Sequence, residues 1–168
     1  NYFTLEGDNI VGYVTGLALY HHWGLTTQVP SELTIATSKN KREKVNVSGL
    51  RISTIPARTQ VTKNNIIILQ FLDILKNVDQ IPDAAPEYVI KKLSENISNY
   101  KVDEIHRMEM LVVTVYAPRT RALLGAFLET YRGYYSALIY KALNPTSKYK
   151  TQISPALFKN MEHWHLKN

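Results

Sequence analysis

The stretch that decides the fold is GYVTGLALYHHWGLTTQVP, which occupies Gly12–Pro30. Val14 and Leu17 belong to an apolar pattern with intervals of three and four residues, and this pattern predicts a helix. Gly24 stands where a left-handed C-cap glycine is expected, and Pro30 prevents any continuation and starts a strand. The segment is therefore predicted to be a helix that ends in a turn.

The residues on both sides of this segment predict short strands. Residues 1–11 alternate in the manner of a strand or an arm, and strands are predicted around Leu33–Ile35, Val45–Val47 and Leu50–Pro56. The polar residues 38–42 are interpreted as the exposed turn of a hairpin between the first two of these strands. We expect a small, mostly antiparallel sheet with one buried face.

From residue 64 onward the apolar spacing is helical. One helix is predicted to begin near Ile66, and a second has Pro86 in its first turn. Three more are predicted over Val102–Tyr116, 117–132 and Ser136–Leu143. Gly125 lies in the middle of the most amphipathic of them, and we expect it to let another backbone approach closely. The predicted fold class is α+β, with a sheet-rich part packed with a helical part. One domain is expected over 1–145, sheet-rich over 1–60 and helical over 64–145. A tail or short helix follows over 146–168.

Composition narrows the classes of function. The 168 residues contain 45% hydrophobic and 20% charged residues, which is typical of a globular domain. The net charge of +6 favours contact with nucleic acid or with an acidic protein. There is no cysteine, which excludes disulfides and thiolate metal sites, and no apolar run is long enough to span a bilayer. We expect a cytoplasmic protein.

Residues that carry catalysis form no recognised motif. The nearest approximations to the carboxylate and lysine cluster of a metal-dependent nuclease are Glu43–Lys44 and Asp103–Glu104. A glycine-rich phosphate loop and a nucleophile elbow are missing from the sequence. We therefore expect a protein that is not an enzyme and that uses no cofactor, with a nuclease-like enzyme as the alternative.

The histidines are better explained by packing than by metal binding. On a helix the adjacent His21 and His22 point about 100° apart, so they do not easily hold one ion. His163 and His165 alternate and share a face of an extended segment, which is more typical of metal ligands. A packed or solvent-exposed tail is the preferred interpretation, and no metal site is predicted.

Basic residues are the remaining functional signal. Candidates for DNA contact cluster in and beyond the predicted hairpin turn: Lys39, Lys41, Arg42, Lys44, Arg51 and Arg58. The alternative is a solvated turn that keeps an edge strand from aggregating. A second group lies on or beside the amphipathic helix and is the candidate for binding a protein partner: Arg119, Arg121 and Arg132.

Three segments together resemble one protein family. They are residues 12–30 with the strand LTIAT at 33–37, then LRISTIPA at 50–57 leading to NNIIILQFLDILKNVDQIPD at 64–83, and YAPRTRALLGAFLE at 116–129. In combination they are similar to the AbiEi-type antitoxins of bacterial type IV toxin–antitoxin systems, which act in phage abortive infection. The resemblance covers about Gly12 to Glu129.

This resemblance implies a function and two partners. In that family a winged-helix DNA-binding domain precedes a larger domain. The protein represses its own operon and neutralises a nucleotidyltransferase-like toxin without requiring a stable complex. Because there is no room for a winged helix before Gly12, the chain is expected to correspond to the C-terminal domain alone. Operator DNA would be bound through the missing domain, and the cognate toxin would be the functional partner. An interaction domain for a different protein is the other alternative.

Overall fold

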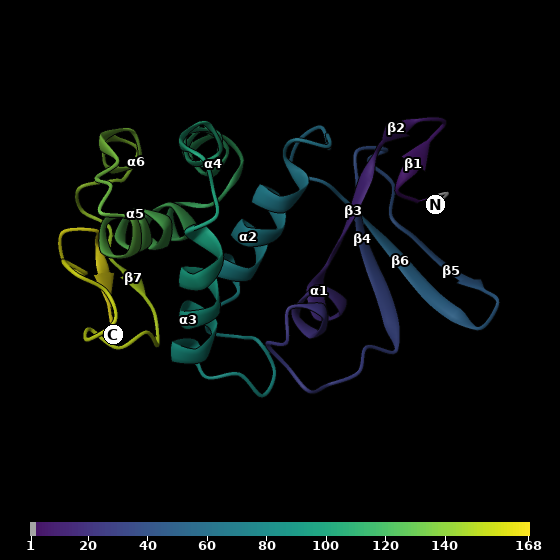
Figure 1. Ribbon diagram of the computed structural model, residues 1–168, viewed down its shortest axis with the longest axis horizontal. Helices are drawn as coiled ribbons and strands as arrows, with labels where there is room; N and C mark the ends of the chain where they lie inside the picture. The colour runs from purple at the N-terminus through teal and green to yellow at the C-terminus, as the bar shows by residue number, and fades with distance from the viewer. Residues whose placement is uncertain (1–2) are drawn as a thin grey trace. The chain divides into compact units, whose positions relative to one another are not determined.

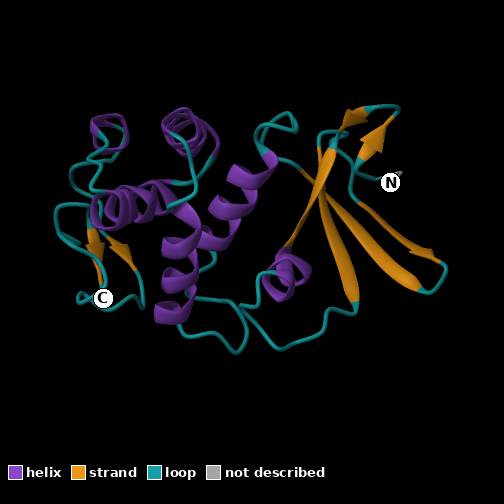
Figure 2. Cartoon of the chain, viewed as in Figure 1, coloured by secondary structure: helices purple, strands orange, loops and turns teal. Residues whose placement is uncertain are grey.

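The computed structural model describes residues 3–168, and the chain forms two compact units (Figure 1). The first unit comprises the chain through Asp73 together with Ile81–Asp83, and the second comprises Ile74–Gln80 and Ala84–Asn168. Strands predominate in the first unit and helices in the second, as Figure 2 shows. The predicted α+β fold class is confirmed.

The first unit is built on a four-stranded sheet with the order β3-β4-β6-β5. Its strands are β3 (Gly12–Thr15), β4 (Glu32–Thr37), β5 (Glu43–Val47) and β6 (Leu50–Pro56). The pairs β3/β4 and β5/β6 are antiparallel, whereas β4 and β6 are parallel. The prediction of a mostly antiparallel sheet is confirmed.

The predicted hairpin between β4 and β5 is wrong, because β6 lies between these two strands. Consecutive residues Ile52, Ser53 and Thr54 of β6 are buried, which suits a central strand, whereas most of β5 is exposed, which suits an edge. Residues 38–42 therefore form a crossover that passes from the end of β4 to the start of β5. The tight hairpin of the sheet is β5–β6, with the turn at Ser48 and Gly49.

The predicted helix within Gly12–Pro30 is shorter than expected. Gly12–Thr15 is strand β3, and helix α1 covers only Gly16–His22. Tyr13, Val14 and Thr15 are aromatic or β-branched residues, which favour a strand. The strand also lets the hydroxyl groups of Tyr13 and Thr15 donate to Asp73 Oδ2, each at 2.8 Å. The left-handed glycine after the helix is confirmed, since Gly24 has φ +68°.

Three further elements complete the first unit. A small antiparallel hairpin forms from β1 (Leu5–Glu6) and β2 (Asn9–Ile10). Helix α2 (Ile66–Lys76) contributes its residues up to Asp73 to this unit and its last turn to the second. The apolar run at 66–69, for which a strand was the alternative, is helical.

The second unit is mainly helical. Its elements are α3 (Pro86–Ile97), α4 (Val102–Val115), α5 (Pro118–Arg132), α6 (Ala137–Lys141), and the parallel pair β7 (Tyr149–Lys150) and β8 (Leu166–Lys167). The four predicted helices are all present, and Pro86 and Pro118 occupy first-turn positions. Within residues 3–168, no helix has the length and apolar character needed to cross a membrane.

The core of the second unit is centred on α5. Leu123, Leu124 and Phe127 of this helix are fully buried, and so is Trp164 near the end of the chain. Gly125 accommodates the indole ring of Trp164, and not the second backbone that the sequence suggested. Residues 146–168 consist of turns and the β7–β8 pair, in place of the tail or short helix that was expected.

Candidate functional site

The basic residues predicted to contact DNA lie mostly at one end of the sheet in the first unit. Lys39, Lys41 and Arg42 are exposed on the crossover, and Lys44 follows on the edge strand β5. Because β4 and β6 are parallel, Arg58, which follows β6, lies at the same end. The exception is Arg51, near the start of β6, which therefore belongs to the opposite end of the sheet.

Ion pairs and hydrogen bonds engage part of this basic group. Lys41 forms an ion pair with Glu43, and Lys39 Nζ lies 3.7 Å from Glu6 Oε1. The Arg51 side chain donates to the carbonyl oxygen of Ser31 at 3.3 Å. The crossover thus presents cations close to carboxylates, which reduces their combined field at a phosphate.

The two residue pairs considered for a nuclease belong to different units of the chain. Glu43 lies on β5 in the first unit, paired with Lys41, whereas Asp103 lies in the first turn of α4 in the second unit. Among the described residues, no group of three or more histidine, aspartate or glutamate side chains is arranged to hold a metal ion. These acidic residues therefore do not share a site within either unit.

Two of the three arginines predicted to bind a partner are held inside the second unit. Arg119 donates to the carbonyl oxygens of Lys150 and Lys76 at 3.0 and 3.1 Å and forms an ion pair with Asp79. Arg121 donates to two further carbonyl oxygens at 3.3 and 3.4 Å. Their guanidinium groups connect separate segments of the backbone, which is a structural use of arginine.

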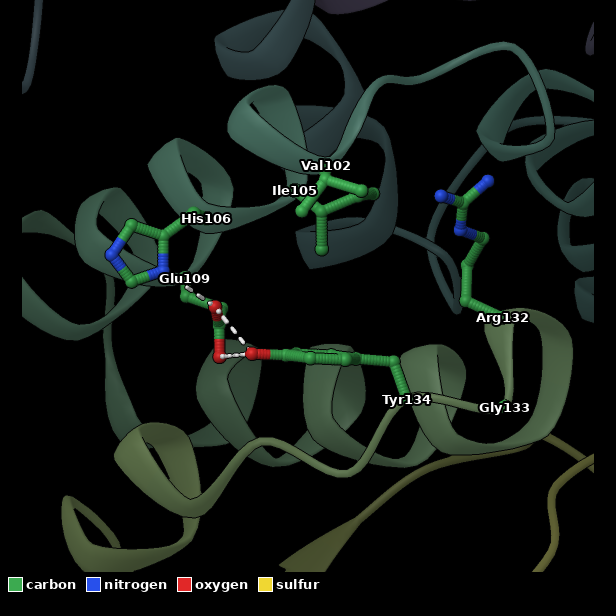
Figure 3. Close-up of a pocket in the computed structure, with 7 residues that line it drawn as sticks. All are labelled: Val102, Ile105, His106, Glu109, Arg132, Gly133 and Tyr134. Carbon is green, nitrogen blue, oxygen red and sulfur yellow. Dashed lines mark hydrogen bonds and ion pairs between the residues drawn. The ribbon is translucent and has the colours of Figure 1, made fainter.

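Arg132, the third arginine, lines a pocket of about 230 Å³ in the second unit, which we call the Glu109 pocket (Figure 3). Helix α4 supplies one wall, and the end of α5 with the segment after it supplies the other. Gly133 ends α5 in the left-handed conformation at φ +60°, and this turn places Tyr134 beside α4. The lining residues are Val102, Ile105, His106, Glu109, Arg132, Gly133 and Tyr134.

The buried carboxylate of Glu109 joins the two walls of this pocket. Its side chain is only 2% exposed, and it accepts hydrogen bonds from Tyr134, Ser136 and His106. The Tyr134 hydroxyl lies 3.1 and 3.0 Å from the two carboxylate oxygens. Ser136 also caps α6, because its Oγ accepts from the backbone N–H of Ile139 at 3.1 Å. These donors satisfy a carboxylate that would otherwise be costly to bury.

The electrostatic state of the pocket follows from this network. Burial, followed by the hydrogen bond and the negative charge of Glu109, raises the pKa of Tyr134 above its ordinary value. His106 Nδ1 lies 3.2 Å from Glu109 Oε2, one helical turn away on α4. Since an ionised carboxylate only accepts hydrogen bonds, Glu109 favours the tautomer of His106 with hydrogen on Nδ1. Glu109 therefore directs its oxygens toward internal donors, and the accessible cation of the pocket is Arg132.

The remaining histidines take part in packing contacts or lie on the surface. His163 stacks on Tyr140 with ring centroids 4.5 Å apart and an angle of 5° between the planes. His165 Nδ1 lies 3.0 Å from the carbonyl oxygen of Ser147. His21 and His22 are exposed in the last turn of α1. Both rings of this alternating pair pack against Tyr140, since His165 lies edge-on to it with ring centroids 6.1 Å apart.

Of the lining of the Glu109 pocket, sequence reasoning identified only Arg132. Glu109 did carry a signal, since the buried positions Ile105, Met108, Glu109 and Val112 have the i, i+3, i+4, i+7 spacing of a buried face. An acid in such a stripe indicates a buried carboxylate that needs donors. Tyr134 and Ser136 are 25 and 27 residues away, so no local motif connects them with Glu109.

No protein-family model, curated protein or solved structure matches the chain. The basic end of the sheet and the Glu109 pocket are therefore interpreted from their own chemistry.

Proposed function

We propose that this chain is a non-enzymatic antitoxin or transcriptional-regulator domain of a type IV toxin–antitoxin system of phage abortive infection. It counteracts a nucleotidyltransferase-like toxin and helps to regulate its own operon. The observation that carries the proposal is the resemblance of three segments between Gly12 and Glu129 to AbiEi-type antitoxins.

Two of these segments meet in the structure, because each contributes a strand to the same sheet. Residues 12–37 form the continuous path β3-α1-β4, and residues 50–83 form β6 and α2 with the turns after it. β4 and β6 pair in parallel from Glu32 with Arg51 to Thr37 with Pro56. β4 and β6 of these two segments are thus the central strands of one sheet, and residues 38–49, which comprise the basic crossover, β5 and its turn, connect them.

Within this function, the basic end of the sheet contributes auxiliary contacts to DNA phosphates. Arg42 and Lys44 are exposed, and their positions on the crossover and the edge strand leave them accessible to a flat charged surface. Such contacts add affinity but no sequence specificity. Each phosphate that they neutralise adds about 0.9 to the slope of log K against log salt concentration.

Co-expression tests the antitoxic part of the proposal. This chain is produced in bacteria together with the product of the neighbouring gene, and growth is scored against cells that carry the toxin gene alone. Rescue from growth arrest supports antitoxic activity in this chain. Failure to rescue, with the chain shown to be folded by circular dichroism, removes that activity from it.

A binding titration tests the DNA part separately. Fluorescence anisotropy with a duplex from the upstream region of the operon is measured at several salt concentrations. Glutamine replaces four cations at the basic end of the sheet, Lys39, Lys41, Arg42 and Lys44, in one variant. A matched variant loses the same charge from exposed lysines of the second unit, Lys91, Lys141, Lys148 and Lys159. The proposal expects a weaker complex and a smaller salt slope for the first variant only, and equal losses in both would contradict it.

A further inference from the structure

We infer that the Glu109 pocket receives one planar apolar side chain of a partner protein, next to an acidic residue of that partner. The planar group lies against the ring of Tyr134, and the acidic group binds the guanidinium of Arg132. This inference is argued from the residues that line the pocket, and it does not depend on which protein the proposed antitoxin counteracts.

The size and walls of the pocket determine the first part of the occupant. Its volume of about 230 Å³ is smaller than the roughly 300–1,000 Å³ of sites for drug-sized ligands, so it suits a single side chain. Figure 3 shows the Tyr134 ring edge-on, with Val102 and Ile105 on the side of one of its faces. A slot between an aromatic face and two aliphatic side chains accepts a flat ring, because aromatic rings pack in offset or tilted arrangements.

The charge at the rim determines the second part. Within the described part of the chain, the side chain of Arg132 makes a single hydrogen bond, from Nη1 to the carbonyl oxygen of Ile97 at 3.4 Å. A guanidinium has five N–H donors, so several remain for a ligand. Figure 3 places this group at the end of the pocket opposite His106 and Glu109. Arginine prefers a carboxylate because the two planar groups form paired hydrogen bonds.

Glu109 does not attract a cationic ligand into the same space. Its oxygens already accept from Tyr134, Ser136 and His106, and its side chain is 2% exposed. On the same helix, Glu104 accepts from the backbone N–H of Lys101 at 2.7 Å and so caps α4. The oxygens of Glu109 are therefore engaged by internal donors, whereas Arg132 keeps N–H donors for a ligand.

Several exposed side chains on the two segments that form the pocket are apolar. Val102, His106 and Met110 are spaced by four residues and lie on one face of α4. Val102 is 81% exposed and Met110 46%, and Tyr134 and Leu138 on the facing segment are also exposed. Exposed apolar side chains that gather around a pocket typically mark an interaction site.

The charge balance of the second unit favours an acidic partner over a basic one. This unit contains thirteen lysine and arginine residues against eight aspartate and glutamate residues, whereas the first unit contains seven against six. Almost all of the net positive charge therefore belongs to the unit that carries the pocket. Such a field raises the rate at which an acidic partner associates and disfavours a basic one.

Peptide titrations followed by ¹H–¹⁵N correlation NMR test the inference on the intact chain. The probe is acetyl-Trp-Glu-amide, and acetyl-Trp-Gln-amide and acetyl-Trp-Lys-amide are the controls for charge. We expect millimolar binding, with shift changes that centre on Val102, His106, Gly133 and Tyr134. The glutamate peptide should bind about two- to fivefold more tightly than the glutamine peptide, as an accessible ion pair provides, and the lysine peptide should bind most weakly.

Variants separate the two parts of the site. Arg132→Gln should abolish the preference for the glutamate peptide and leave tryptophan binding in place. Arg132→Lys keeps the charge without the planar fork and should retain only part of that preference. Tyr134→Phe keeps the ring and should bind, whereas Tyr134→Leu should not. Lys141→Gln, an exposed change outside the pocket, should behave as wild type.

Three results would overturn the inference. Shift changes that are absent or centred on another surface would remove the pocket as a binding site. Equal affinity for the lysine and glutamate peptides would remove the acidic partner. If sedimentation of the free protein shows a dimer, and its formation shifts the same pocket signals, the occupant is a second copy of this chain.

Discussion

The indole ring of Trp164 lies so close to Gly125 that a Cβ added to this glycine would come within 2.2 Å of ring atom Cε3. One turn further along α5, Glu129 Oε2 accepts a hydrogen bond from Trp164 Nε1 at 2.6 Å. The glycine and the carboxylate thus hold one fully buried side chain from the end of the chain. Residue 125 must therefore be a glycine for the indole ring of Trp164 to pack against α5.

Gly125→Ala should destabilise the protein, although alanine is the better helix former. The added methyl group collides with the buried ring, and overpacking of this kind costs about 1–3 kcal/mol. Urea denaturation of the variant measures the loss. In a Trp164→Ala background, which itself costs about 3–5 kcal/mol, the same change should be neutral or stabilising. If Gly125→Ala is equally harmful in both backgrounds, contact with the indole is not the cause.

Glu109→Gln should lower the pKa of Tyr134. That pKa is raised first by burial and then by the hydrogen bond and charge of Glu109, and the substitution removes the charge. NMR detection of the tyrosine Cζ resonance during a pH titration gives the value. Tyr135 is the internal control, because its pKa is raised by burial, then by Tyr140 and Glu129. An unchanged Tyr134, or equal shifts in both residues, would contradict this role of Glu109.

Stability should fall as the pH rises above about 10, the ordinary pKa of tyrosine. Burial, and secondarily the charge of Glu104, raises the pKa of Tyr100 in the folded protein. The unfolded chain therefore loses this proton at a lower pH than the folded chain, so alkaline conditions favour unfolding. Denaturation midpoints between pH 8 and 11 should decline less steeply in Tyr100→Phe. The exposed Tyr88→Phe variant is the control for removal of a tyrosine hydroxyl, and equal slopes in all three proteins would exclude Tyr100 as a cause.

Tyr13→Phe and Asp73→Ala should be strongly coupled in a double-mutant cycle. Asp73 is buried and accepts from Tyr13 and Thr15, and removing one partner of such a hydrogen bond costs about 1–3 kcal/mol. The double variant should lose clearly less than the sum of the single losses, measured by urea denaturation. Strictly additive losses would show that the two side chains do not interact in solution.

The same pair explains why the first part of the chain was predicted incorrectly. Tyr13 and Thr15 both reach one carboxylate, which is possible in a strand, where residues two apart share a face. On a helix they would point about 200° apart. Asp73 lies 60 residues from Tyr13, so the contact that favours the strand is invisible to local periodicity. Only the part of the pattern after Gly16 is helical.

Other features depended more directly on local sequence. The apolar face of α5 and the first-turn proline Pro86 of α3 were sufficient to predict these two helices. Gly125 was recognised as a place of close approach, but its neighbour was not, because Trp164 is 39 residues away in the chain. The Glu109 pocket was missed for the same reason, since its donors come from a segment that only the fold brings to α4.

The parallel pairing of β4 with β6 has a consequence for the chain as it is being synthesised. β4 is complete at Thr37, but its partner β6 ends only at Pro56, so one edge of β4 is without that neighbour for about one to four seconds of translation. An open strand edge in a nascent chain invites pairing with other chains. Lys39, Lys41 and Arg42 come directly after β4 in the sequence, and charged residues in such positions oppose aggregation. The crossover cations thus stand directly after a strand that obtains its parallel neighbour only 19 residues later.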